Sequence, residues 1–71
     1  MKRYAIMVEQ AHENYAAYVP DLPGCVVTGV TVEETERLLR EAIELHVAGM
    51  LEDDLVVPEP SSVVNYLEVS A

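Results

Sequence analysis

The sequence predicts a single α+β domain with the element order β-β-β-α-β, in which one helix packs across one face of a mixed sheet. Two observations lead to this prediction. The first half of the 71-residue chain carries short alternating apolar and polar runs between turn-forming residues, which is typical of strands. Residues 31–52 then place apolar side chains at helical spacing, and a further alternating run follows at residues 63–70.

The first two strands are expected at residues 2–10 and 15–19. In the first run Tyr4, Ile6 and Val8 fall on one face, because successive side chains of a strand point to opposite sides. The polar segment AHEN between the two runs is short. Two strands joined by so short a connection form an antiparallel hairpin.

A rigid turn is expected at PDLPGC, residues 20–25, just before a third strand in CVVTGV. Pro20 ends the second strand because it lacks a backbone donor. Pro23 presets φ for the second position of a type II turn, and Gly24 allows the positive φ of the third position. Cys25 is expected to close the turn as a small, half-buried side chain.

The helix is expected to begin after Thr31. The sequence TVEE forms a capping box, in which the Thr31 hydroxyl accepts from the amide of Glu34 and the Glu34 carboxylate reaches back to Thr31. Acidic residues follow Leu51 and oppose the negative end of the helix dipole, so the helix should end near Leu51 or Glu52. Two prolines then force an extended connection to the fourth strand at residues 63–70.

The composition is strongly acidic. Thirteen Asp and Glu against four Lys and Arg give a net charge of −9, which argues against direct binding to nucleic acid phosphates. A basic protein partner fits this field, although the charge can also serve solubility alone. Hydrophobic residues make up 51% of the chain, which indicates either apolar surface for a partner or a tight core. A core this small is often supported by oligomerisation, so a dimer or tetramer is expected.

The sequence also bounds the compartment. One cysteine cannot form an internal disulfide, which favours a reducing environment. No apolar run has the length of a signal peptide core or a membrane span. A cytoplasmic protein without membrane contact is therefore expected.

No catalytic, metal-binding or cofactor-binding residues are predicted. Two-metal nuclease chemistry needs converging carboxylates, yet the middle of the first strand offers Ile6, Met7 and Val8. Cys25 has no basic neighbour in sequence that would activate its thiol. Two histidines and one cysteine without short spacing give no zinc signature. The chain is therefore not expected to be an enzyme.

Several motifs together resemble the HicB-like family of antitoxins. They are the hexapeptide Pro20 to Cys25, Thr28 with Gly29, the T-x-E-E helix start at Thr31, and Pro58 with Pro60. The resemblance covers the whole chain and implies one HicB-like domain at residues 1–71 with a partial ribonuclease-H-like fold. It also implies binding to HicA, a small basic mRNA-cleaving toxin.

The chain departs from the family pattern in two ways. Val30 and Thr35 stand where the family often has an acidic residue and Ala. Many such antitoxins also carry a C-terminal DNA-binding tail, and none is visible here. Operator binding by this chain alone is therefore not expected.

Acidic side chains are the expected contacts with the toxin, because they match its RNA-binding surface. They are Asp21, Glu33, Glu36, Glu52, Asp53 and Asp54. Asp21 is also expected to bond nearby backbone amides ahead of its own turn. The alternative is a homo-oligomeric structural or ligand-binding protein without a toxin, which pairs through an exposed sheet edge and the apolar margin of the helix.

Overall fold

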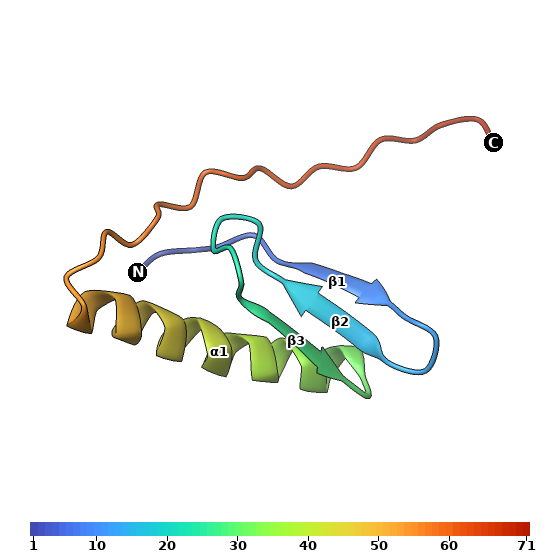
Figure 1. Ribbon diagram of the computed structural model, residues 1–71. Helices are drawn as coiled ribbons and strands as arrows, with labels where there is room; N and C mark the ends of the chain where they lie inside the picture. The colour runs from blue at the N-terminus through green and yellow to red at the C-terminus, as the bar shows by residue number, and fades with distance from the viewer.

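A three-stranded antiparallel sheet and one long helix form the folded body of the protein (Figure 1). The computed structural model describes residues 1–71. The strands are β1 (Met7–Gln10), β2 (Tyr15–Tyr18) and β3 (Val26–Gly29), and the helix is α1 (Val32–Glu52). The strands lie in the order β1-β2-β3, and α1 crosses one face of the sheet in contact with all three. The α+β class and the single helix across one face are confirmed.

The register of the sheet places small and branched residues under the helix. Ala17 of β2 lies opposite Val8 of β1 and Val27 of β3. Ala17 is completely buried, and both valines pack against the core. The alternation read from the sequence therefore assigns the covered face of the hairpin correctly.

The core is small and draws on the loops as well as the strands. Its buried apolar members are Ala17, Val19, Leu22, Cys25 and Leu39. Leu39 comes from the middle of α1, whereas Leu22 and Cys25 come from the turn between β2 and β3. The turn is thus part of the hydrophobic core as well as a connector.

The backbone of this turn is held by hydrogen bonds at both ends. The amide of Cys25 donates to the Leu22 carbonyl at 3.1 Å, and Gly24 between them has φ 85°. This is the positive φ that a type II turn requires at its third position. The amide of Val19 donates to the Cys25 carbonyl at 3.3 Å, which closes the loop and directs Leu22 inward.

The start of α1 has the expected cap with one difference. Thr31 Oγ1 accepts from the amide of Glu34 at 3.0 Å. The Glu34 carboxylate accepts from the amide of Val30 at 3.1 Å, one residue before the donor of the usual capping box. Both hydrogen bonds fix the direction in which the chain enters the helix.

The predicted fourth strand and mixed sheet are not formed in this structure. Residues 63–70 are extended (Figure 1) but belong to no strand, and the sheet is antiparallel throughout. A β-strand needs a neighbour that pairs with its backbone amides and carbonyls, and residues 56–71 make no backbone–backbone hydrogen bond. The first strand is also shorter than expected: it begins at Met7, although Tyr4 and Ile6 still pack against the core.

Candidate partner-binding site

Three consecutive acidic residues form an exposed turn at the end of α1. They are Glu52, Asp53 and Asp54, here called the acidic turn, and all three are exposed. The last turn of α1 contains no basic residue. Because the C-terminus of a helix carries partial negative charge, the carboxylates and the helix dipole add to one another here. Negative charge is therefore concentrated at this end of the helix.

The backbone of the acidic turn is fixed by a Schellman motif. The amide of Leu55 donates to the Met50 carbonyl at 2.8 Å, and the amide of Asp54 donates to the Leu51 carbonyl at 3.2 Å. Asp54 adopts φ 57°, in the left-handed region where glycine is the usual residue. An acidic residue at this position therefore carries both a backbone cost and an unfavourable interaction with the dipole, and neither helps folding.

The structure separates the predicted contacts into groups. Glu33 and Glu36 are exposed near the start of α1, whereas the acidic turn lies at its other end. A helix rises about 1.5 Å per residue, so 21 residues of α1 hold the two ends roughly 30 Å apart. The predicted acids do not form one patch, and the acidic turn is the only place where three of them adjoin.

Asp21 is engaged within the protein instead of standing free. Its carboxylate accepts four hydrogen bonds, from the amides of Ser61 and Ser62 at 2.9 Å each and from their hydroxyls at 3.1 and 2.8 Å. These bonds, led by that from the Ser62 amide, lower the pKa of Asp21 to about 2. The expectation that Asp21 bonds amides ahead of its own turn is wrong, since its donors lie some 40 residues further along the chain.

The face of the sheet opposite α1 carries an apolar row. Tyr18 of β2 lies opposite Met7 of β1 and Val26 of β3. Their exposed fractions are 38%, 41% and 60%, which is unusual for residues in register on one face. This row was not predicted from the sequence. It could have been inferred from strand YAAY, which carries apolar residues on both of its faces.

The groups considered for catalysis are not assembled. No three His, Cys, Asp or Glu side chains lie close enough together to hold a metal ion. Cys25 is buried, and this burial raises the pKa of its thiol. Helix α1 is not long and apolar enough to cross a membrane.

Comparison with known proteins places the chain among proteins of bacteria and phages. Residues 4–70 match the family model described as HicB-like antitoxin of bacterial toxin–antitoxin systems. A 14.9 kDa protein from the rep-hol intergenic region of Haemophilus phage HP1 is 39% identical over 64 residues, which are 90% of this chain and 48% of the phage protein. The chain thus spans about half the length of that relative.

Two bacterial relatives match over most of their length. A UPF0150 protein of Helicobacter pylori is 35% identical over 90% of each chain. A UPF0150 protein of Synechocystis is 31% identical over 93% of this chain and 85% of its own. With nearly the whole sequence matched to one family model, the chain belongs to the HicB-like antitoxin family of bacterial toxin–antitoxin systems.

Proposed function

We propose that this protein is an antitoxin module that binds and blocks a small, basic, mRNA-cleaving toxin of the HicA type. The observation that supports the proposal most is the acidic turn, which concentrates three carboxylates where they oppose the helix dipole. A feature that costs stability and is fully exposed is expected at a functional surface. Membership of an antitoxin family supports a toxin as the class of partner.

In this proposal the chain acts by covering the toxin and performs no catalysis itself. A toxin that cleaves mRNA must present a cationic surface to RNA phosphates. The acidic turn would occupy that surface and compete with RNA, while the folded body blocks access to the catalytic residue. The encounter would take place in the cytoplasm, where mRNA is found, and it needs no cofactor.

The finer fold assignment is part of the same proposal. A partial ribonuclease-H-like topology requires a fourth strand, which residues 63–70 would supply on gaining a backbone partner. The domain would then be the single HicB-like unit that the family model spans over residues 4–70.

Neutralising the acidic turn tests the proposed mode of binding. The triple variant Glu52→Gln/Asp53→Asn/Asp54→Asn should bind the toxin about 10- to 100-fold more weakly, mainly through slower association at low salt. Surface plasmon resonance at several salt concentrations measures this. The control Glu9→Gln/Glu13→Gln/Glu44→Gln removes the same charge from exposed positions elsewhere and should change affinity much less. Equal losses in the two variants would show that net charge alone, and not the acidic turn, guides binding.

A second candidate function is a homo-oligomer that works without a toxin. The exposed row of Met7, Tyr18 and Val26 favours it, because contiguous apolar surface on a small protein marks a site of association. Gene context separates the two candidates. An adjacent reading frame for a basic protein of similar size supports the antitoxin, whereas its absence, together with no binding to any HicA-like protein, supports the homo-oligomer.

A further inference from the structure

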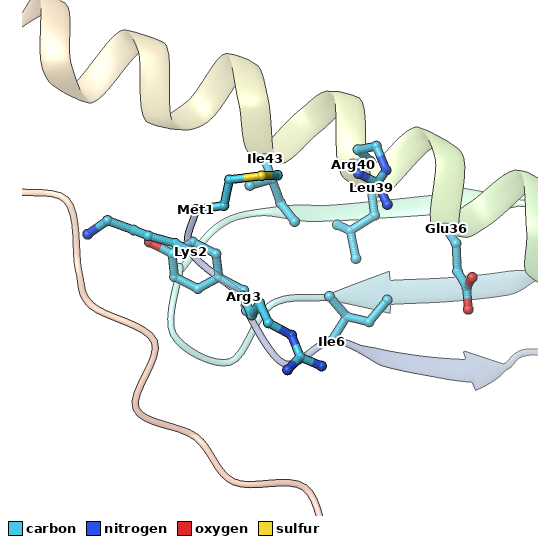
Figure 2. A pocket seen from close by; sticks show the side chains of 9 residues that line it. Met1, Lys2, Arg3, Ile6, Glu36, Leu39, Arg40 and Ile43 are labelled. Atoms are coloured by element: carbon cyan, nitrogen blue, oxygen red, sulfur yellow. The ribbon is translucent and has the colours of Figure 1, made fainter.

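A groove of about 390 Å³ lies between the N-terminal segment and α1. Its floor is apolar: Figure 2 shows Leu39 and Ile43 reaching from the helix toward Ile6. The volume falls in the range of roughly 300–1,000 Å³ that ligand pockets occupy. The volume and the apolar floor of the groove suit a bound ligand or chain segment.

The rim of the groove gathers most of the positive charge of an acidic chain. Lys2, Arg3 and Arg40, three of the four Lys and Arg residues, line it. Lys2 is paired with Glu59 at 2.6 Å, whereas Arg3 and Arg40 form no salt bridge. Glu36 is the one acid in the lining, so the two unpaired arginines outnumber it. The groove therefore suits an occupant that is mostly apolar and carries a negative charge.

The C-terminal arm, residues 63–71, has these properties. Its large apolar side chains are exposed, from 55% at Val64 to 89% at Tyr66 and Leu67. Glu68 is its one charged side chain. The arm has the alternating pattern of a strand, yet its backbone has no partner. The chain as a whole has a net charge of −9. An apolar segment with a single charge therefore stands out as one that packs against another surface.

The arm does not fill the groove of its own chain. The four hydrogen bonds between Asp21 and the serine pair Ser61–Ser62 fix its root beside the turn between β2 and β3. Beyond this point the arm runs away from the sheet and the helix, past the end of the folded body (Figure 1). One copy thus leaves both an empty groove and an uncovered arm.

We propose that the arm of a second copy of this chain occupies the groove, and that the exchange is reciprocal. A two-fold dimer pairs the same two surfaces twice, so each copy would bury its arm and fill its groove. The arm would lie along the free edge of β1, which pairs with β2 on one side only, and unpaired strand edges accept added strands. Glu68 would meet Arg3 and Arg40, which offsets locally the repulsion between two acidic copies.

Paired variants of the full chain test the two halves of this contact. The arm variant Tyr66→Gln/Leu67→Gln should weaken the dimer at least about 100-fold, from the loss of two large apolar groups. Its control Leu45→Gln/Leu51→Gln changes exposed residues of α1 and should leave the dimer intact. The groove variant Arg40→Glu should also weaken the dimer, whereas Arg37→Glu, which alters the cation outside the groove, should not. Sedimentation velocity over a concentration series gives each dissociation constant.

Mixing the arm variant with the groove variant distinguishes reciprocal arm exchange from an arm that folds back into the groove of its own chain. The arm variant keeps an intact groove and Arg40→Glu keeps an intact arm, so together they should form a heterodimer through one contact, detected by tagging one of them. A wild-type chain that stays monomeric at high micromolar concentration would overturn the proposal. So would a dimer unaffected by the arm variant, or a mixture that forms no heterodimer. None of these results depends on a toxin, so they leave the proposed function to its own test.

Discussion

Asp21 shows how one side chain ties two distant parts of the chain together. It lies in the turn that contributes Leu22 to the core, and it holds Ser61 and Ser62 at the root of the C-terminal arm. Sequence reasoning identified the turn, because Pro23 and Gly24 have local conformational signatures. It could not identify the serines, because nothing local in the sequence reveals a hydrogen bond that spans 40 residues.

Acid should release the arm from Asp21. The hydrogen bonds to the charged carboxylate lower its pKa to about 2, from about 3.9 in an unfolded chain. Their contribution to stability is therefore fully present above about pH 4 and is lost as the pH falls through 2. NMR titration should show the Ser61 and Ser62 amides shifting with a midpoint near pH 2, and Asp21→Asn should abolish that shift. A midpoint near pH 4 would mean that the contact is not formed in solution.

Gly29 marks a second contact that residue type alone did not reveal. A Cβ at this position would overlap the Oγ1 of Thr35, which is fully buried. Gly29→Ala should therefore destabilise the protein by about 1–3 kcal/mol, the usual range for overpacking. Gly49→Ala is the matched control: no atom lies within 4 Å of the added Cβ, so it should stabilise the helix by about 1 kcal/mol. Urea unfolding measures both, and equal effects would exclude the close approach of Gly29 to Thr35.

At the scale of elements, α1 was the most predictable part of the fold. Its cap at Thr31 and its end at Glu52 follow from local chemistry, namely a capping box and acids that oppose the dipole. The segment at residues 63–70 was less predictable. Its alternation correctly signals strand character, but a strand forms only where another backbone pairs with it, and a sequence pattern does not say which chain supplies that backbone.

The end of α1 offers a test of stability against function. Asp54→Gly relieves the left-handed backbone, worth about 1 kcal/mol, and removes a charge that opposes the dipole. Its free energy of unfolding, measured in urea, should rise by about 1–2 kcal/mol. It should also bind the toxin more weakly. Asp54→Asn removes the charge and keeps a side chain. Its free energy of unfolding should therefore rise only by the smaller, electrostatic contribution. A less stable Asp54→Gly variant would contradict the strain assigned to this position.

At the scale of the whole molecule, the surfaces divide by character. The acidic turn lies at one end of α1, the apolar row covers the open face of the sheet, and the cationic groove lies between α1 and the N-terminal segment. Composition predicted an acidic protein and left open whether its apolar residues form a tight core or a partner surface, but it could not predict this segregation. The tertiary fold brings Arg3 and Arg40 to one groove, and it takes Asp21 out of the set of free acids.

The central claim is that this chain covers a toxin by charge and shape. The most direct measurement titrates the purified protein into a purified HicA-type toxin, with RNA present, and follows cleavage and complex formation together. We expect cleavage to stop at a fixed stoichiometry, with weaker inhibition by Glu52→Gln/Asp53→Asn/Asp54→Asn. RNA cleavage that continues at saturating protein, with no complex detected, would contradict the account.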